Sequence, residues 1–247
     1  MGAIKLIINA DDFGCAPSIN QSIACAFKQG LINSTTMIVI LPGFEDGIRL
    51  AKLQGFDKQI GLHLNITDGK SITDLSGTGL TDELGQFLRN SVCKNDFFLD
   101  NVLRSKIKEE LDAQYHKLVS YGITPTHFDS HHHIHTKPKL VTLFVEFAKE
   151  KNIALRIAAV DNKKNLFKAI YKTLLNRYYK IKRVNFSDVF CNVESINAYR
   201  GKENNISEVI EIMVHPILNK DNKLYDDFSN ECLTDLLPVI ISKYSLN

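Results

Sequence analysis

Residues 5–14, KLIINADDFG, join a buried strand directly to two acidic side chains, and the architecture of the chain follows from this arrangement. The part KLIINA (residues 5–10) is a short, β-branched apolar run, which is typical of a strand buried on both faces. A loop is expected at residues 11–15. Pro17 then opens a predicted helix over residues 17–28, with Gly30 just beyond its end. The sequence therefore begins with a strand, an acidic loop and a helix.

The same alternation continues along the chain. Further strands are predicted over residues 34–41, 60–65, 154–160, 188–192 and 209–214, and further helices over residues 47–53, 101–121, 138–149, 163–183 and 231–244. Such alternation indicates parallel strands joined by crossover helices. We predict an α/β fold, a single-domain distorted (β/α) barrel of mostly parallel strands over residues 1–247. An open doubly wound sheet is the alternative, because it has the same alternation.

Residues 66–100 interrupt this pattern. They are rich in Gly, Thr, Ser and Asp and show no clean period. Loops of such length often serve as lids or binding loops. An inert surface insertion is the other interpretation.

Composition narrows the class of protein. Hydrophobic residues make up 44% and charged residues 23%, and the net charge of +2 lacks the basic bias of a nucleic-acid binder. The five cysteines are scattered without a CxxC pair, which favours a reducing compartment. We find no signal peptide and no apolar stretch of bilayer length, so we expect a cytoplasmic protein without stable membrane insertion.

Residues 163–183 form a basic stretch that carries Phe167, Tyr171, Tyr178 and Tyr179. One interpretation is a helix that lies on a membrane surface. The other is a helix that packs by its aromatic face and leaves its lysines in water. The second interpretation is favoured by the usual behaviour of amphipathic helices.

Asp11 and Asp12 follow the first strand. Two adjacent carboxylates are costly to hold together unless a cation or a proton relieves their repulsion. Adjacent residues also point in different directions, so one can bind a metal while the other serves in acid–base chemistry. The alternative is one helix-capping aspartate beside a solvated one.

Histidines mark three further strand ends, which is the edge where parallel α/β folds place their active sites. His63 lies inside the apolar run GLHL, where a polar ring needs a partner, either a metal or a hydrogen bond. His215 follows a late strand and suits a general acid or base near neutral pH. One carboxylate and two imidazoles leave coordination positions open, as a catalytic rather than a structural metal site does.

The run DSHHHIH (residues 129–135) is the strongest of these signals, because packing does not explain four histidines in five positions. On an extended backbone Asp129, His131, His133 and His135 would share one face. On a helix, His131 and His135 would share a face instead. Either arrangement gives a metal ligand and further imidazoles that support it or contact a substrate.

Four segments together resemble the ordered motifs of the YdjC-like carbohydrate deacetylases, a family that includes chitooligosaccharide deacetylases. They are NADDFG (residues 9–14), GLHL (61–64), THFDSHHHIH (126–135) and MVHP (213–216). The resemblance spans nearly the whole chain. It implies a distorted (β/α) barrel and removal of the acetyl group from an N-acetylated sugar.

The resemblance also implies roles for individual residues. One divalent metal ion, Zn²⁺ or Mg²⁺, would be bound by Asp12, His63 and His131. Asp11 would be the catalytic base and His215 the proton donor. The resemblance also suggests that Arg156 reaches the active site. From the chemistry of the motifs, we expect Asp129 to orient His131, and Arg156, His133 and His135 to contact the substrate or tune the base. Val214, Ile217, Ala158 and Ala159 depart from the residues common in the family, and they leave the metal positions intact.

Two other functions are open at this stage. One is metal-dependent hydrolysis of another bond, such as a phosphoester or a cyclic amide, although no second carboxylate-rich metal site is present in the sequence. The other is non-catalytic binding of a sugar or metal, for which a retained Asp11 would have no use. The expected partner is a small carbohydrate, and a symmetric homodimer is one open assembly.

Overall fold

The computed structural model of this chain describes residues 4–93, 99–160, 165–196 and 208–245. Residues 94–98 of the expected insertion and residues 163–164 of the expected basic helix lie outside the described residues. A sheet of seven parallel strands runs in the order β5-β4-β3-β2-β1-β7-β6. The strands are β1 (Ile4–Phe13), β2 (Ser34–Met37), β3 (Ile60–Leu64), β4 (His127–Ser130), β5 (Ala154–Leu155), β6 (Val189–Asn192) and β7 (Glu208–Val214).

Hydrogen bonds carry this sheet around into a distorted barrel. The edge of β5 that faces away from β4 is bonded to residues 184–186. Leu155 N donates to Val184 O (2.6 Å), and Phe186 N donates to Leu155 O (2.8 Å). Residues 184–186 lead directly into β6, whose partner is β7. The prediction of a distorted barrel of parallel strands is therefore confirmed, and the open doubly wound sheet was the wrong alternative.

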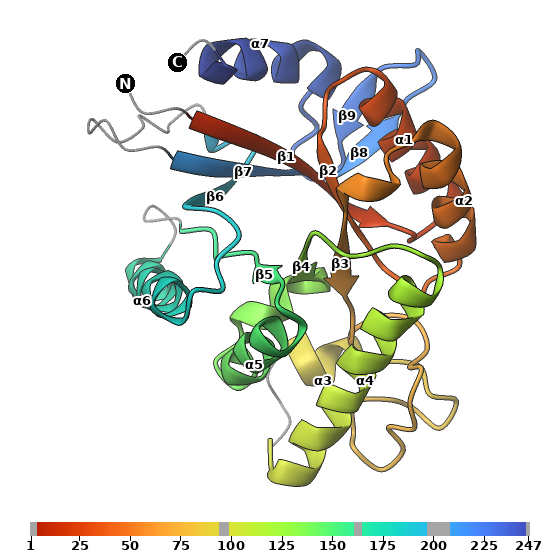
Figure 1. Cartoon of the computed structure of the whole chain (residues 1–247), viewed down its shortest axis with the longest axis vertical. Helices are drawn as coiled ribbons and strands as arrows, with labels where there is room; N and C mark the ends of the chain where they lie inside the picture. Colours follow the sequence, from red (N-terminus) through yellow and green to blue (C-terminus); the bar gives the residue numbers. More distant parts are fainter. Residues whose placement is uncertain (1–3, 94–98, 161–164, 197–207, 246–247) are drawn as a thin grey trace.

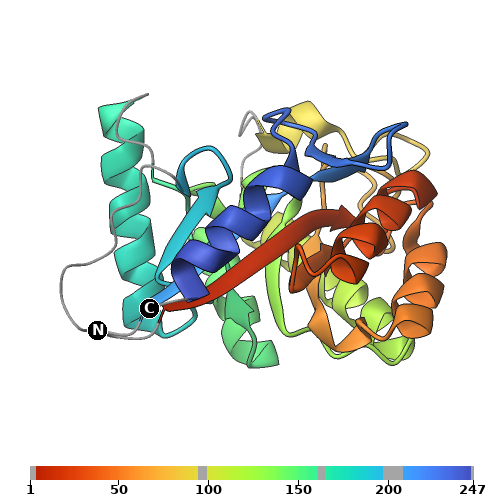
Figure 2. The ribbon, with the colours of Figure 1, turned by 90° about the horizontal axis from the view of Figure 1, so that it is seen from above.

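Helices lie outside this curled sheet (Figures 1 and 2). They are α1 (Pro17–Lys28), α2 (Phe44–Gln54), η1 (Asp57–Gln59), α3 (Arg89–Cys93), α4 (Asn101–Ser120), η2 (His131–Thr136), α5 (Val141–Lys151), α6 (Leu166–Lys182) and α7 (Leu233–Ser245). A small antiparallel pair that the sequence did not predict, β8 (Pro216–Leu218) and β9 (Leu224–Asp226), follows β7. Among the described residues, no helix combines the length and apolar content needed to cross a membrane.

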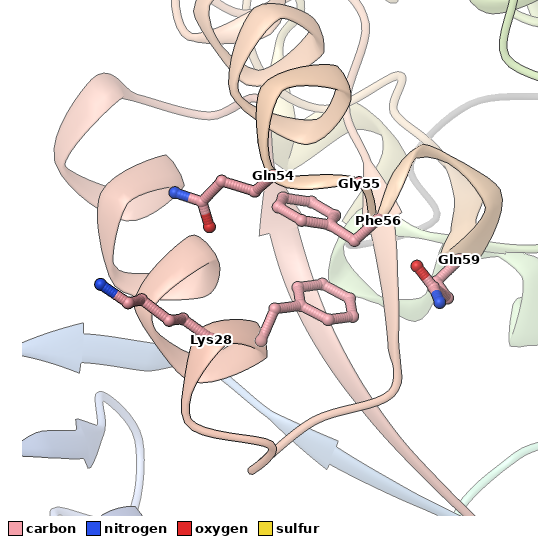
Figure 3. Close-up of a pocket in the computed structure, with 6 residues that line it drawn as sticks. Lys28, Gln54, Gly55, Phe56 and Gln59 are labelled. Atoms are coloured by element: carbon pink, nitrogen blue, oxygen red, sulfur yellow. The ribbon is translucent and has the colours of Figure 1, made fainter.

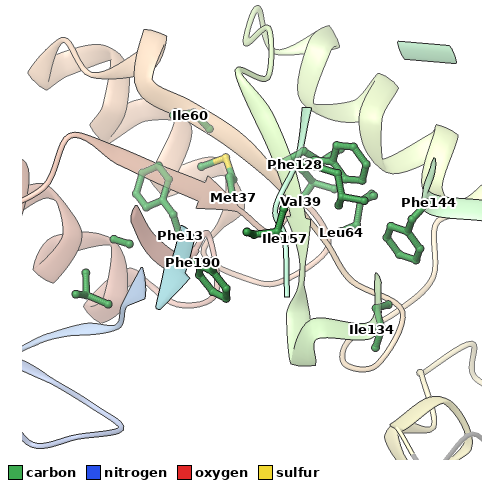
Figure 4. Packing of buried hydrophobic residues seen from close by; sticks show 14 of the residues in the cluster. Phe13, Met37, Val39, Ile60, Leu64, Phe128, Ile134, Phe144, Ile157 and Phe190 are labelled. Carbon is green, nitrogen blue, oxygen red and sulfur yellow. The ribbon is translucent and has the colours of Figure 1, made fainter. Parts of the chain in front are cut away.

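Apolar side chains from the strands and the flanking helices form the core (Figure 4). Phe13, Leu64 and Phe128 come from three strands and Phe144 from α5, and each is fully buried. Burial of apolar surface stabilises by roughly 25 cal/mol per Å², so these side chains hold the strands in place. The site described below therefore rests on a rigid frame.

Three strands differ from the expected ranges. β2 ends at Met37, although a strand was expected over residues 34–41. β1 runs on to Phe13 because it contains a bulge, and β5 ends at Leu155 although residues 154–160 form an apolar run. Beyond Leu155, the backbone of Arg156 still bonds to β4, with Arg156 N donating to Phe128 O (3.0 Å). Apolarity alone does not distinguish a paired strand from a buried irregular segment.

The segment between β3 and α4 is packed rather than loose, as far as residue 93. Glu110 of α4 is buried, and its carboxylate accepts hydrogen bonds from Ile72 N (3.0 Å) and Thr73 N (2.7 Å). Leu75 and Leu80 join the core. This anchoring brings the start of the segment to the carboxyl ends of the strands.

Candidate metal centre

A bulge in β1 separates the two neighbouring aspartates. Ala10 pairs with Thr35 and Phe13 with Met37, so β1 carries one residue more than β2 over this stretch. Asp12 adopts a left-handed φ of 67°, which is unusual for a residue other than glycine. As a result Asp11 is 2% exposed inside the barrel, while the Asp12 side chain is 22% exposed and faces the histidines.

The glycine of the same motif is also explained by geometry. Gly14 has a φ of 85°, and a Cβ added there would lie 2.4 Å from Ile38 O. Any larger residue would push β1 away from the segment that follows β2. The motif ADDFG therefore encodes one tight turn of the backbone.

Three possible metal ligands converge at this point. Asp12 Oδ1 lies 3.3 Å from His63 Nε2 and 2.9 Å from His131 Nδ1, and one ligand atom from each residue lies within 4.8 Å of the others. Asp12 Oδ1 is buried and has no hydrogen bond of good geometry among the described residues. An oxygen and two imidazole nitrogens that converge in this way fit a divalent cation such as Zn²⁺.

His63 is held from behind by a buried carboxylate. Its Nδ1 lies 2.6 Å from Asp129 Oδ1, and Thr36 Oγ1 donates to Asp129 Oδ2 (3.1 Å). Burial lowers the pKa of His63, but Asp129 and Asp12 outweigh it and raise that pKa to about 10 when no cation is bound. A carboxylate on the far nitrogen fixes the ring so that Nε2 faces Asp12.

Arg156 is the centre of a buried ionic cluster. Its Nη1 and Nη2 bind the two oxygens of Asp11 (2.6 and 2.7 Å), and Nη1 also contacts Asp129 (2.5 Å). Its Nε donates to Glu211 Oε1 (2.7 Å). Burial acts to raise the pKa of Asp11, but Arg156 overcomes it, so the pKa of Asp11 lies below its usual range. Asp11 is therefore ionised at neutral pH.

His131 has a carboxylate of its own, at the exposed side of the site. Its Nε2 lies 3.1 Å from Asp68 Oδ2, and the Asp68 side chain is 40% exposed. Asn65 Oδ1 accepts from Thr67 N (2.9 Å) and Asp68 N (3.1 Å) and so sets this turn. His63 and His131 thus each have a carboxylate partner, but the partner of His63 is buried and the partner of His131 is partly exposed.

The histidine segment changes conformation along its length, from strand β4 to the kinked 3-10 helix η2, so neither the wholly extended nor the regular helical alternative describes it. His132 and His133 have left-handed φ values of 53° and 51°, which turn the chain sharply within η2. His131 consequently faces Asp12, while His135 is buried and bonded to Ser130 Oγ (2.6 Å). Asp129 and His131 meet the site, but the segment has no common face that includes His135.

His133 and His132 occupy different environments. Burial, together with Arg156, lowers the pKa of His133 to about 4, and its ring lies 6.0 Å from that of Phe190. Burial also lowers the pKa of His132 to about 4, and its Nδ1 is bonded to Thr67 Oγ1 (2.8 Å). Both imidazoles are therefore neutral near pH 7.

His215 lies just beyond β7. Its backbone N donates to Asp226 Oδ1 (2.6 Å), and its ring Nδ1 is 3.8 Å from the same oxygen. Burial lowers the pKa of His215, but Asp226, Asp11 and Asp12 outweigh it and raise the pKa above its usual value. The imidazolium form is thereby favoured near the acidic pair.

Sequence reasoning found the central residues and missed several that support them. Asp11, Asp12, His63, Asp129, His131 and Arg156 are linked by the contacts given above. The residues missed are Asn9, Thr36, Thr67, Asp68, His132, Glu211 and Asp226. Glu211 gave a usable signal, since a carboxylate inside the apolar run 209–214 requires a partner. Asp68 gave none within its polar surroundings.

A hollow of about 460 Å³ lies elsewhere, between the end of α1 and the α2–β3 connection (Figure 3). Its lining includes Phe27, Lys28 and Phe56. It adjoins the start of β3, whereas the convergent ligands lie at the carboxyl ends of the strands. We therefore take the ligand cluster, and not this hollow, as the candidate site.

Comparison with known proteins finds relatives named for a deacetylase activity. A Clostridium beijerinckii protein named carbohydrate deacetylase is 33% identical over 219 residues, covering 86% of this chain and 81% of that protein. A Vibrio cholerae protein of the same name is 39% identical over 154 residues, covering 62% of this chain but only 58% of its own length.

A crystal structure of an Enterococcus faecalis protein, titled as a candidate cellobiose-phosphate cleavage protein, shares the fold. It has a TM-score of 0.74 and 24% identity, and the match covers 99% of this chain and 96% of that one. The family model described as YdjC-like protein matches residues 5–237. Because this match spans nearly all of the sequence, the chain belongs to the YdjC-like protein family.

Proposed function

We propose that this protein is a metal-dependent hydrolase that removes the acetyl group from an N-acetylated sugar, a chitooligosaccharide or a related N-acetylglucosamine compound. The names of the relatives support the reaction class. The observation that carries the proposal is the convergence of Asp12, His63 and His131 directly beside the ionised Asp11. A metal site beside an ionised carboxylate is what hydrolysis requires, whereas a protein that only binds sugar would not need the carboxylate.

In this proposal Asp12, His63 and His131 hold one divalent cation, either Zn²⁺ or Mg²⁺. Such a cation supplies Lewis acidity, which polarises a carbonyl oxygen and lowers the pKa of water from about 16 to about 7. The partial exposure of Asp12 and His131, at 22% and 16%, leaves the cluster open on one side. An amide carbonyl could approach there.

Asp11 is the proposed general base. It is adjacent to Asp12 and ionised at neutral pH, which is the state that can accept a proton from the attacking water. The Arg156 contacts that keep it ionised also reduce its basicity. Arg156 and Asn9 fix its two oxygens, with Asn9 Nδ2 donating to Oδ1 at 2.8 Å. Since Arg156 is fully buried, we assign it to orienting and tuning this base.

His215 is the proposed proton donor to the departing sugar amine. Its raised pKa extends the protonated form, which a general acid requires, to higher pH. Asp226 Oδ1, which lies 3.8 Å from the ring Nδ1, supports the charged ring. Asp129 orients His63 rather than the expected His131. We propose that His133 shapes the wall of the site, while the buried His135 supports the segment through Ser130.

Acetate release tests the proposal. The protein would be stripped of metal, reloaded with Zn²⁺ or Mg²⁺, and incubated with free, phosphorylated and lipid-linked N-acetylglucosamine compounds, including oligomers. We expect acetate from at least one substrate, only after reloading. Release of phosphate without acetate would favour phosphoester hydrolysis, and binding of sugar with no product would favour a binding protein. Cytoplasmic location and a homodimer stay predictions from the sequence.

A further inference from the structure

Helix α6 packs against the barrel by one face only. Leu175 and Tyr179 are buried, and the hydroxyl of Tyr179 donates to His135 O (2.8 Å). Tyr171 donates in the same way to Thr136 O (2.8 Å). These contacts agree with the interpretation that the tyrosines of this stretch pack inward, and they attach α6 directly to the histidine segment η2.

The opposite face of α6 is apolar and exposed. Phe167 is 84%, Ile170 49%, Leu174 60% and Ile181 68% exposed. Their spacing places them on one side of the helix. In both overall views α6 lies at the outer edge of the molecule (Figures 1 and 2). A continuous apolar stripe of this kind marks a surface that binds something; we call it the α6 stripe.

The charged residues of α6 indicate which kind of partner binds the α6 stripe. Residues 165–183 contain no acidic residue, and their basic residues are Lys168, Lys172, Arg177, Lys180, Lys182 and Arg183. Lys180 and Lys182 are the neighbours of Ile181 in the chain, so they lie about 100° to either side of it on the helix. Lys180 is paired with Asp188, whose Oδ1 lies 3.0 Å from its Nζ, so its charge is partly offset. Lys168 stands beside Phe167 in the same way. The stripe is thus bordered by cations.

This charge argues against a second copy of the chain as the partner. A symmetric dimer would place the same patch on both sides of the interface and bring the two basic helices together. Like charges next to an apolar contact oppose association. An anionic bilayer, in contrast, accepts the apolar side chains at the boundary of its acyl region and attracts the cations beside them.

We propose that the α6 stripe binds the surface of an anionic phospholipid bilayer, with the helix lying in the plane of the interface. Phe167, Ile170, Leu174 and Ile181 would enter the boundary between headgroups and acyl chains. The basic residues would remain at the level of the lipid phosphates. This surface is independent of the proposed deacetylase activity, because none of its residues belongs to the metal centre.

Sedimentation with vesicles tests the proposal. The full chain would be mixed with phosphatidylcholine vesicles that contain no, moderate or high phosphatidylglycerol. We expect the bound fraction to rise with phosphatidylglycerol content and to fall between about 0.1 M and about 0.5 M salt, because salt screens the charges. Absence of binding at every composition would overturn the proposal.

A triple variant, Phe167→Ser with Ile170→Ser and Leu174→Ser, tests whether vesicle binding depends on the α6 stripe or on exposed apolar residues in general. We expect it to bind vesicles at least about tenfold more weakly, since it loses most of the apolar insertion. The matched control carries Leu53→Ser, Leu84→Ser and Val102→Ser, three exposed apolar residues elsewhere that are 75%, 74% and 70% exposed. This control should bind as the original does.

Two further results would overturn the proposal. One is equal loss of binding in the stripe variant and in the control variant. The other is a dimer in sedimentation velocity that becomes a monomer in the stripe variant, together with no vesicle binding, since the stripe would then be covered by a second copy. A thermal midpoint equal to that of the original chain would show that both triple variants are folded.

Discussion

His63 and His131 carry the same kind of carboxylate partner in opposite surroundings. Asp129 lies 2.6 Å from His63 Nδ1 and is fully buried, whereas Asp68 lies 3.1 Å from His131 Nε2 and is 40% exposed. Asp129 also contacts Arg156, while Asp68 sits in a turn of the segment between β3 and α4. One half of the candidate site is thus built into the barrel and the other is attached at its mouth.

The difference in burial gives the two histidine–carboxylate pairs different roles. In the buried half, Asp11, Asp129 and Glu211 share the Arg156 guanidinium, because a buried charge without a partner is strongly unfavourable. In the exposed half, water competes with each contact and screening weakens it. We expect the buried half to set the stability and orientation of the site, and the exposed half to admit and adjust the substrate.

The largest effect is expected at the proposed base, in the buried half. Asp11→Asn should lower kcat by about 10²- to 10⁴-fold, the usual contribution of general base catalysis. Metal affinity should change little, because Asp11 is not among the three convergent ligands. Steady-state acetate release measures the first and competition with a chelator the second. Near-original kcat would show that Asp11 is not the base.

The next effect concerns stability. Arg156→Met leaves Asp11, Asp129 and Glu211 without their shared cation, and we expect a loss of about 3–5 kcal/mol in the free energy of unfolding. Arg104→Met is the matched control, because Arg104 pairs with the exposed Glu146 at 2.5 Å. That change should cost less than about 1 kcal/mol. Equal losses in urea unfolding would remove the contrast between the two environments.

Metal affinity compares the two histidine partners directly. Asp129→Asn should weaken metal binding by about 10- to 100-fold, as the loss of a partner that orients a metal ligand does. Asp68→Asn should weaken it by less than about tenfold, since solvent already screens that pair. Isothermal titration with Zn²⁺ gives both values. A larger effect at Asp68 would reverse the assignment of the two halves.

The smallest expected effect is a shift in the pH profile. Because the pKa of His215 is raised in the folded protein, the donor form is present at low pH and is lost as pH rises through that pKa. Asp226→Asn removes a charge that raises this pKa, so the alkaline limb of kcat should move to lower pH. Asp227→Asn, at an exposed neighbour, should leave the limb in place. An unmoved limb in Asp226→Asn would argue against His215 as donor.

Much of the barrel was predictable because strand and helix periods are local properties of the sequence. The strands at residues 60–64, 189–192 and 208–214 lie within about two residues of the predicted ranges. The bulge at Asp12 and the early end of β5 were not predicted. They depend on which backbone groups a neighbouring strand offers, and a single sequence does not state this.

The residues of the candidate site fall into the same two groups, those that local sequence patterns predict and those that depend on contacts between distant parts of the chain. Asp11, Asp12, His63 and His131 were predicted because they belong to motifs at strand ends. The left-handed turn at His132 and His133 was not, because polar histidines give no preference between the backbone alternatives strong enough to outweigh packing. The position of Asp68 beside His131 depends on a chain of hydrogen bonds through Asn65, Gln114 and Glu110. These bonds join parts of the chain that are distant in sequence.

The most direct test of the central claim is the metal content of the purified protein after dialysis against Zn²⁺, measured by mass spectrometry beside Asp12→Ala and His131→Ala. The account predicts one bound ion per chain in the original protein and almost none in either variant. The variants should keep the original circular dichroism spectrum. Absence of bound metal in the original, or equal metal in all three proteins, would contradict a centre formed by Asp12, His63 and His131.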